Sequence, residues 1–320
     1  MRFSRRAALG LTLAPLAVPA FAQEWPTRPV RFIVPYPPGG PTDIMGRIVA
    51  QAVQGPLGQP VVVENRAGAN GIIGSEQVAR AAPDGATFLV NASAHAIVPH
   101  LTPRMPFDAI ADFVPVTNIA AVPLMVVVNP SLPVRSVAEL VAYAKANPGR
   151  LAYASSSQGG APHLAAELFK LMAGVDMTHV PYRGSAAAYP DIIAGRVHMI
   201  FDNIPGALAQ ARENRVRALG VTSEQRSPVV PDTPSIAETL PGYDMASWTC
   251  ICAPAGLPPA IVQRMSALSR RALESEDLKR QYLEQGATAW WTTPEQIADF
   301  RAAEERRLAP IIRASGARVE

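Results

Sequence analysis

The sequence predicts an α/β fold made of two similar units that are joined by two strands. From Val30 onward, short β-rich segments alternate with helical segments, as in an open α/β sheet. A hydrophobic strand, a glycine pair and a helix that opens with proline follow one another twice, at 30–43 and at 151–163. Apolar, strand-like segments near Leu124 and near Trp248 lie where the chain would cross between the units.

The first unit is expected to alternate strands and helices between residues 30 and 91. Pro41 suits the first helical position, because its missing N–H is not needed there and its fixed φ is already helical. Strands rich in β-branched residues are expected at 30–35, 61–64 and 87–91, with helices at 41–54 and 73–82.

The second unit follows a continuous apolar strand at 124–128. Ser136 and Glu139 match a capping box that opens a helix ending near Ala146. Pro162 is expected at the first position of its helix, and Ser185 is a suitable N-cap for the next one. Strands are expected at 151–154, 179–182, 197–201, 217–222 and 247–253, helices at 162–173, 185–194 and 206–214, and further helices from Leu257 to the C-terminus.

The two crossing strands divide the chain into lobes. Residues 23–123 and 248–320 are expected to form one lobe, which is discontinuous in sequence, and residues 124–247 the other. Two crossings, one out and one back, make a two-strand hinge.

Residues 1–22 match a secretory signal. Arginines precede an apolar run at 7–21, which is too short for a permanent membrane anchor, and residues 20–22 read Ala-Phe-Ala, as at a cleavage site. The start Ser4-Arg5-Arg6 fits a twin-arginine signal and a general secretory (Sec) signal equally well. We therefore expect export to the periplasm and a mature chain that begins near Gln23.

The mature chain is predicted to be electrically neutral. Of the 29 lysines and arginines, three lie in residues 1–22, which contain no acidic residue, so 26 basic residues remain against 26 acidic ones. This balance argues against a nucleic-acid partner, which requires a basic face. Cys250 and Cys252 lie near the upper limit of the Cα separation that a disulfide tolerates, so we expect free, packed thiols.

Catalytic and metal-binding patterns are incomplete in this sequence. The five histidines do not have the spacing of metal ligands, and the chain contains neither Gly-x-Ser-x-Gly nor a phosphate loop ending in Gly-Lys-Ser or Gly-Lys-Thr. Asp43, Asp191 and Asp202 could be acid/base groups, but capping of helix starts and strand ends explains them as well. We expect no catalytic residue, no cofactor and no metal. Besides a binding protein that does no chemistry, two other functions stay open. One is an exported, hydrolase-like enzyme that acts on a carboxylate in the same cleft between the lobes, and the other is the ligand domain of a regulator.

The two glycine turns are candidate anion sites. Each leaves unpaired backbone N–H groups at the start of a helix, where the helix dipole is positive, and glycine lets the backbone approach a ligand closely. Either turn alone could simply lead the chain into a helix, but two of them predict a clamp on one anion. Ligands of open α/β sheets gather at the carboxyl ends of strands, so polar residues there should face the same cleft, although each loop alone could be an ordinary turn. These are Tyr36, Asn70, Ser93, His95, Arg183, Ser185 and Asp202.

Motifs along nearly the whole mature chain resemble those of the tripartite tricarboxylate transporter substrate-binding proteins, also called Bug proteins. They include PYPPGGPTD at 35–43, VENRAGANG at 63–71, YASSSQGGAPHLAAELFK at 153–170 and VPYRGSAAAYPDIIAGRVHMIFDN at 180–203. The resemblance implies a type II periplasmic binding protein fold, with two Rossmann-like lobes that close on a small organic carboxylate. It also implies delivery of that ligand to membrane permease subunits or to a sensor, and we expect the protein to be a monomer.

The resemblance also implies which residues hold the carboxylate. The motifs carry the family's site onto Pro38, Gly39, Gly40, Thr42 and Asp43 in one lobe and onto Ser155, Ser156, Ser157, Gly159 and His163 in the other. Asp202 takes the position of a strand-end aspartate that can meet an amino group or polar end of some ligands. The chain departs from the family pattern at 157–160, where members often have Gly-x-Gly-Ser, and at 250–252, where they often have an aromatic and small residues.

Overall fold

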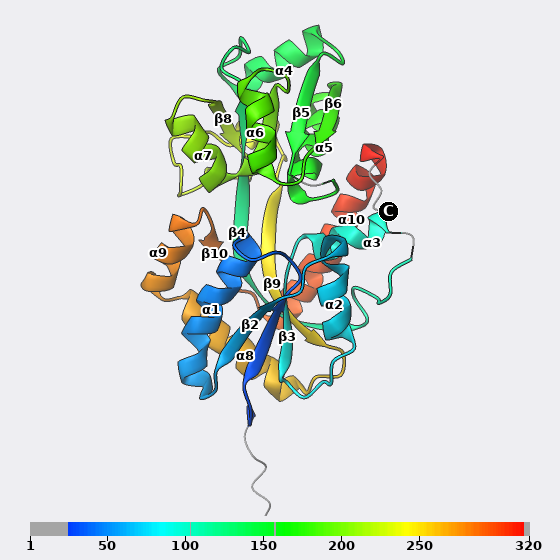
Figure 1. The fold of residues 1–320 in the computed structure, drawn as a ribbon, viewed down its shortest axis with the longest axis vertical. Helices are drawn as coiled ribbons and strands as arrows, with labels where there is room; N and C mark the ends of the chain where they lie inside the picture. The colour runs from blue at the N-terminus through cyan, green and yellow to red at the C-terminus, as the bar shows by residue number, and fades with distance from the viewer. Residues whose placement is uncertain (1–24, 103, 157, 317–320) are drawn as a thin grey trace, which may run out of the picture.

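The computed structural model describes residues 25–316, with the exception of residues 103 and 157. The predicted signal, residues 1–22, and the predicted site residue Ser157 therefore lie outside the described residues. The described part of the chain forms two α/β lobes stacked along the long axis of the molecule (Figure 1).

The lower lobe in Figure 1 holds the first strands of the chain, which returns to this lobe near its C-terminal end. Its parallel strands pair in the order β2-β1-β3, as in consecutive βαβ units. Its elements are β1 (Val30–Val34), α1 (Pro41–Leu57), β2 (Val61–Asn65), η1 (Ala69–Gly71), α2 (Ile72–Ala79), β3 (Thr87–Ala92), α3 (Ala94–Leu101), α8 (Pro259–Leu273), α9 (Glu276–Glu284), β10 (Thr288–Ala289) and α10 (Pro294–Ser315).

The upper lobe repeats this arrangement. Strands β7, β5 and β6 are parallel and pair in that order, with helices on both faces. Its elements are α4 (Val137–Ala146), β5 (Leu151–Ser155), α5 (Ala161–Ala173), β6 (Met177–Pro181), α6 (Ser185–Ile193), β7 (Met199–Asn203), α7 (Ile204–Arg212), β8 (Arg217–Val221) and η2 (Ile236–Glu238).

Two long strands connect the lobes, β4 (Phe113–Val128) and β9 (Ala246–Pro254). Residues 113–123 of β4 pair antiparallel with β9, and residues 124–128 pair with β7 and β8 of the upper lobe. Strand β4 therefore belongs to both sheets. The predicted connection by two crossing strands is confirmed.

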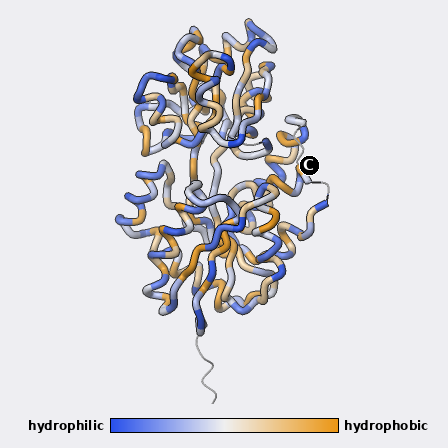
Figure 2. Tube along the Cα trace, in the orientation of Figure 1, coloured by the Kyte–Doolittle hydropathy of each residue, from blue (hydrophilic) through white to orange (hydrophobic). Residues whose placement is uncertain are grey.

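Alternate residues of the strands fill a hydrophobic cluster on each face of each sheet. In β1, Phe32 packs into one cluster and Ile33 into another on the opposite face, and Val126 and Val127 of β4 alternate in the same way. Strands buried on both faces read as the near-continuous apolar runs seen in the sequence. Figure 2 shows these hydrophobic segments inside the lobes and hydrophilic segments around them.

Helix α10 packs against both lobes. Its first half lies on the lower lobe, where the Phe300 ring meets the Trp248 ring edge to face with centroids 5.4 Å apart. Its last turns bury Leu308, Ile311 and Ile312 in a core cluster of the upper lobe. The end of the chain therefore also links the lobes, in addition to β4 and β9.

Helix α3 and the first part of β4, residues 113–123, form where the sequence analysis predicts neither a helix nor a strand. Only Ser93 separates α3 from β3, and Pro99 inside the helix interrupts the helical pattern. Prolines also interrupt residues 113–123, but β4 accommodates Pro115 at a shift of its register against β9.

Two details predicted at helix starts are wrong, the helical position of Pro162 and the N-cap role of Ser185. Pro162 occupies the second helical position of α5, because Gly160 is the N-cap and Ala161 the first residue. Gly184 is the N-cap of α6, and Ser185, the predicted N-cap, is already helical.

The capping box predicted at α4 forms only in part. The Ser136 hydroxyl accepts the Glu139 amide, but the Glu139 carboxylate accepts the amide of Arg135 instead of that of Ser136.

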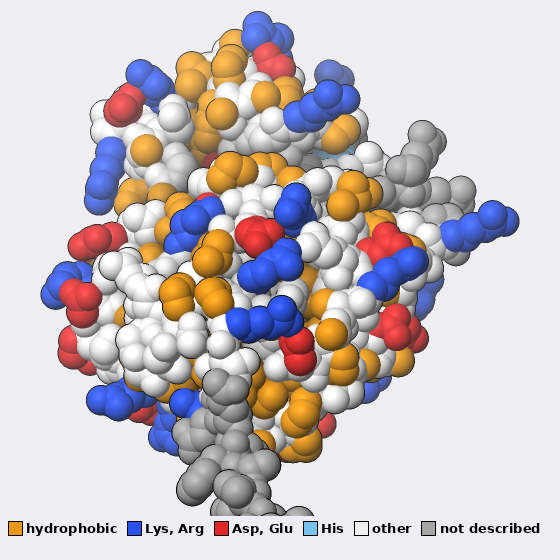
Figure 3. Space-filling view, turned by 60° about the horizontal axis from the view of Figure 1, so that its bottom comes forward, with side chains coloured by type: hydrophobic (Ala, Val, Ile, Leu, Met, Phe, Trp, Pro, Cys, Tyr) orange, Lys and Arg blue, Asp and Glu red, His pale blue; other side chains and the backbone are white. Residues whose placement is uncertain are grey.

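The remaining features concern the thiols and the surface. Cys250 and Cys252 are free and buried, as expected, with their Sγ atoms 3.6 Å apart. Within residues 25–316, as far as they are described, no helix has both the length and the apolar character needed to cross a membrane. Acidic and basic side chains intermingle on the face shown in Figure 3.

Candidate functional site

The two glycine turns line one cavity between the lobes. The cavity has a volume of about 210 Å³ and lies where the starts of α1 and α5 approach each other. Its lining consists of Tyr36, Gly40, Pro41, Thr42, Ala92, Ser93, Ala94, Val122, Leu124, Ser156, Ala161, Pro162, Asn203, Ser247 and Thr249. Of the predicted site residues, the structure thus brings together Tyr36, Gly40, Thr42, Ser93 and Ser156.

The first turn is held by the side chain of Asp43. Gly39 has a left-handed φ of 82°, and its amide donates to the Asp43 carboxylate at 2.9 Å. Arg47 and Asn65 also donate to this carboxylate, which is 3% exposed. Burial opposes ionisation of Asp43, but the hydrogen bonds from Arg47, Gly39 and Asn65 outweigh it and hold its pKa below the ordinary value. The Gly39 amide is therefore occupied.

The second turn repeats this geometry with a different acceptor. Gly159 has a φ of 74°, and its amide donates to Nδ1 of His163 at 3.0 Å. The following glycines, Gly40 and Gly160, have nearly identical backbone angles, φ −79° with ψ 165° and φ −79° with ψ 171°. Both helices therefore start from the same backbone conformation.

Each helix start retains backbone donors for a ligand. Helix geometry leaves the amides of Thr42 and Asp43 in α1, and of Ala161 and His163 in α5, without acceptors inside the helix. In the described part of the chain no other acceptor reaches them. Among the described residues that line the cavity there is no lysine or arginine, so backbone amides, helix dipoles and hydroxyl groups are what they offer an anion.

Hydroxyl groups from β9 complete the floor of the cavity, and the sequence analysis did not select them. Ser247 and Thr249 lie two residues apart on β9, and the Ser247 hydroxyl is 3.2 Å from that of Ser93. Polar residues two apart on an otherwise apolar strand share one face, and this signal could have identified them. The Tyr36 hydroxyl donates to Asn91 at 2.6 Å, and burial raises the pKa of Tyr36, which keeps it neutral.

A second cavity of about 410 Å³ adjoins the first and shares Pro41 and Asn203 with it. Gly39, Ser185 and Asp202, all predicted site residues, line it. Asp202 is already occupied, because the hydroxyls of Ser185 and Tyr189 donate to it at 2.5 and 2.8 Å, as does the Asn203 amide. Burial raises the pKa of Asp202, although these hydrogen bonds favour its ionised form.

His95 lies apart from both cavities. Its Nδ1 accepts from the Asn91 side-chain amide at 2.8 Å, and its Nε2 donates to the Ala109 carbonyl at 2.9 Å. These two partners fix a neutral ring, and burial together with the Arg301 guanidinium lowers the pKa of His95 to about 3. His95 therefore connects β3, α3 and the loop before β4.

The remaining predicted site residues do not line either of these two cavities. Asn70 lies in η1 with a left-handed φ of 52°, and Arg183 is exposed beside α6. The others are Pro38 and Asp43 in the first turn and Ser155, Gly159 and His163 in or below the second. Asp43 and His163 nevertheless act on the site, because each holds the turn in front of it.

The structure bears on the enzyme alternative at Ser155. The Ser155 hydroxyl lies 2.7 Å from Nε2 of His179, which resembles the pairing of a nucleophile with its base. Ser155 is fully buried, however, so a substrate does not reach it. The described residues contain no group of three or more His, Cys, Asp or Glu side chains that could hold a metal ion.

Comparison with known proteins gives consistent matches over nearly the whole chain. The family model described as tripartite tricarboxylate transporter family receptor matches residues 45–317. Protein BugT of Bordetella pertussis is 39% identical over 313 residues, which cover 97% of this chain and 96% of BugT. The structure of R. palustris Rpa4515 with adipate is 37% identical, covers 92% of this chain and 99% of its own, and has a TM-score of 0.81. MatC from Rhodopseudomonas palustris with bound malate is 30% identical, with coverages of 90% and 100% and a TM-score of 0.75.

These matches confirm the fold expected from the sequence, the type II periplasmic binding protein fold. They also confirm the resemblance to the Bug proteins. The family and its structural neighbours are periplasmic solute-binding proteins, not enzymes.

Proposed function

This chain belongs to the tripartite tricarboxylate transporter receptor family, and we propose that it captures a small organic carboxylate in the 210 Å³ cavity and delivers it to a membrane permease. The observation that carries the proposal is the meeting of two helix N-termini, α1 and α5, at one cavity whose described lining residues include no basic side chain. Adipate and malate, bound by two structural neighbours, are both dicarboxylates, so aliphatic dicarboxylates are the first ligand class to test.

The energetics require more than the two helix dipoles. Each dipole contributes about 0.3 to 2 kcal/mol to holding an anion. Micromolar affinity corresponds to about 8 kcal/mol. The hydroxyl groups of Ser93, Ser156 and Thr249 and the apolar lining from Val122 and Leu124 supply further contacts. The adjoining 410 Å³ cavity gives room for the second end of a dicarboxylate.

The proposed mechanism is closure of two lobes on the ligand. Residues 23–123 and 248–320 form one lobe and residues 124–247 the other, with the last turns of α10 carried against the upper lobe. A ligand that contacts both turns favours the closed state and shifts the population toward it. The closed monomer, exported to the periplasm by the segment 1–22, is then the form that permease subunits or a sensor recognise.

A thermal-shift screen of carboxylic acids, beginning with adipate and malate, tests this function. Binding to the folded state raises the melting temperature by mass action, by the equivalent of about 2.7 kcal/mol at a hundred times Kd. If no carboxylate raises the melting temperature, the proposed ligand class is wrong. Product analysis of the same mixtures checks the enzyme alternative, since a binding protein returns the acid unchanged.

The variant Gly40→Val tests the cavity itself. Gly40 has an ordinary φ of −79°, and a Cβ there would have only the Pro37 carbonyl oxygen within 4 Å, at 3.7 Å, so the fold should tolerate valine. The added side chain should abolish the thermal shift. Gly55→Val, at a position on α1 with open space around it, is the matched control and should keep the shift. An undiminished shift in Gly40→Val would remove this turn from the site.

A further inference from the structure

The two turns at the cavity use the same device with different acceptors. In each turn, the amide of the first glycine donates to the side chain four residues later, Asp43 in one lobe and His163 in the other. Asp43 carries a negative charge that Arg47 balances at 2.9 Å. His163 offers an uncharged ring nitrogen. The pseudo-repeat therefore contains one chemical difference at an equivalent position.

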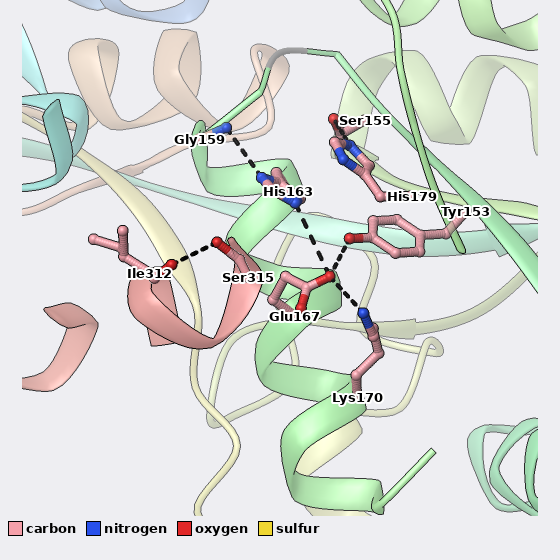
Figure 4. Close-up of polar contacts among 9 residues, drawn as sticks. All are labelled: Tyr153, Ser155, Gly159, His163, Glu167, Lys170, His179, Ile312 and Ser315. Atoms are coloured by element: carbon pink, nitrogen blue, oxygen red, sulfur yellow. Dashed lines mark hydrogen bonds and ion pairs between the residues drawn. The ribbon is translucent and has the colours of Figure 1, made fainter. Parts of the chain in front are cut away.

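His163 lies in a buried cluster of polar and aromatic side chains beneath the second turn (Figure 4). It is 1% exposed, and its ring stacks on that of His179 with centroids 3.9 Å apart. Its Nε2 has no hydrogen-bond partner among the described residues and lies 4.0 Å from Oε1 of Glu167. Glu167 in turn accepts from the Tyr153 hydroxyl and from Lys170, the latter at 2.8 Å.

The hydrogen bond from Gly159 fixes the protonation of the His163 ring. A backbone N–H can only donate, so Nδ1 must be unprotonated and the ring proton lies on Nε2. A doubly protonated ring would place two N–H groups against each other. Burial, His179 and Lys170 lower the pKa of His163 to about 3, in agreement with this geometry.

The second turn is also confined from the other lobe. A Cβ on Gly159 would lie 2.2 Å from Cδ1 of Leu101, which belongs to α3 of the lower lobe. Gly159 thus contacts both the His163 ring of its own lobe and Leu101 of the other lobe. Ala161 and Pro162, which follow directly, line the cavity.

We propose that His163 is a positioning residue for the ligand, not a residue that touches it. As an uncharged acceptor for the Gly159 amide, it fixes the turn so that the start of α5 presents its amides to the cavity. It does so without a negative charge that would repel an anion. An aspartate at this position would lie near the carboxylate of Glu167. Lys170 would not balance the added negative charge, because it is already paired with Glu167. This inference rests on the proposed function and deepens it.

Three substitutions separate the acceptor from the shape and the charge of the ring. His163→Asn keeps a neutral acceptor, as asparagine does in turns. His163→Phe keeps a stacked ring but has no acceptor, and His163→Asp copies the acceptor of the other lobe with its charge. The matched control is His198→Phe, because Nδ1 of His198 also accepts a backbone amide in the same lobe, that of Ala152 at 3.0 Å, away from the cavity.

Calorimetric titration with the carboxylate that gives the largest thermal shift measures the effect on binding. We expect Kd to rise about tenfold or more in His163→Phe, since a buried amide is left without its acceptor. It should stay within about threefold of wild type in His163→Asn and His198→Phe. His163→Asp should bind more weakly than His163→Asn, and more so at low salt. Equal weakening in His163→Asn and His163→Phe would overturn the proposal.

Hydrogen exchange of the Gly159 amide in the ligand-free protein tests the positioning without any ligand. The amide should be protected in wild type and His163→Asn and should exchange much faster in His163→Phe. Unchanged protection in His163→Phe would overturn the role of His163 even if binding were altered. Absence of any carboxylate binding by wild type, with the exchange pattern as expected, would instead contradict the proposed function alone.

Discussion

Replacing Gly159 by alanine tests whether the two lobes meet at the second turn in solution. Gly39 and Gly159 have similar left-handed angles, φ 82° and φ 74°, so alanine costs about 1 to 2 kcal/mol at either position for the backbone alone. A Cβ on Gly39 has no heavy atom within 4 Å, whereas one on Gly159 lies 2.2 Å from Cδ1 of Leu101. Gly39→Ala is therefore the matched control for backbone strain.

The steric part is worked out from the surroundings of Leu101. Cγ and Cδ2 of Leu101 also lie 3.5 and 3.7 Å from the added Cβ, and the side chain is 3% exposed within a core cluster. Leu101 must therefore move within packed surroundings, which typically costs about 1 to 3 kcal/mol. Gly159→Ala should lower the free energy of unfolding by this much more than Gly39→Ala.

Urea unfolding followed by tryptophan fluorescence measures the difference. Leu101→Ala, made in the wild-type and Gly159→Ala backgrounds, identifies its source, because contacting residues show coupling energies of about 0.5 to 3 kcal/mol. Without the leucine side chain, the penalty at Gly159 should fall to that measured at Gly39. Equal penalties for Gly39→Ala and Gly159→Ala in wild type would refute the contact between α3 and the second turn.

Three further outcomes are expected. Asp43→Asn should lower the free energy of unfolding at neutral pH by about 2 kcal/mol, because hydrogen bonds to a charged group are lost. The pKa of Asp43 is held below its ordinary value of 3.8. The extra free energy of unfolding of wild type over Asp43→Asn is therefore fully present above about that pH and is lost as the pH falls through the folded-state pKa. If this difference stayed constant into strong acid, the prediction would be wrong. His95 and His163 are buried and neutral, with each pKa lowered from 6.5 to about 3, so the unfolded state binds more protons in this window. Stability should fall by up to about 1.4 kcal/mol per pH unit for each as the pH drops from 6.5, and His95→Gln should flatten the slope measured by urea titrations. Cys250 and Cys252 are fully buried, so an aromatic disulfide reagent should label them only at the rate of unfolding, and rapid labelling of native protein would show that β9 is open to solvent.

The strand pattern and the repeated glycine turns could be predicted from the sequence because both depend on local chemistry. The run at 124–128 is apolar throughout, and that at 30–34 is interrupted only by the half-buried Arg31, as expected for strands covered on both faces. Helix α3 could not be predicted, because Pro99 interrupts its pattern and its packing against α10 stabilises it from a distance in sequence. The same holds for residues 113–123, where β4 accommodates Pro115 at a shift of its register against β9.

The location of the candidate site could be predicted from the sequence. Which residues line the cavity and which ones only hold the turns in place could not. The sequence predicts that Gly39, Gly40 and Gly159 lie in turns. It does not predict which of their backbone amides already donate to side chains of the protein itself. That depends on the rotamers of Asp43 and His163. The hydroxyl groups of Ser247 and Thr249 lie at the cavity because β9 pairs with β3 and β4, which are far from it in the sequence.

Helix α10 changes what kind of hinge this molecule can have. If only β4 and β9 connected the lobes, the lobes could bend and twist relative to each other. Because helix α10 packs against both lobes, a relative motion of the lobes must either keep both of its contacts or bend the helix. Pro310 lies inside α10, between Leu308 and Ile311, which both pack in the core cluster of the upper lobe. Because proline has no amide hydrogen and its ring crowds the preceding turn, α10 lacks one backbone hydrogen bond there and bends most easily at this position. A bend of α10 at Pro310 would therefore displace the last turn, with Ile311 and Ile312, relative to Leu308 within the upper-lobe contact.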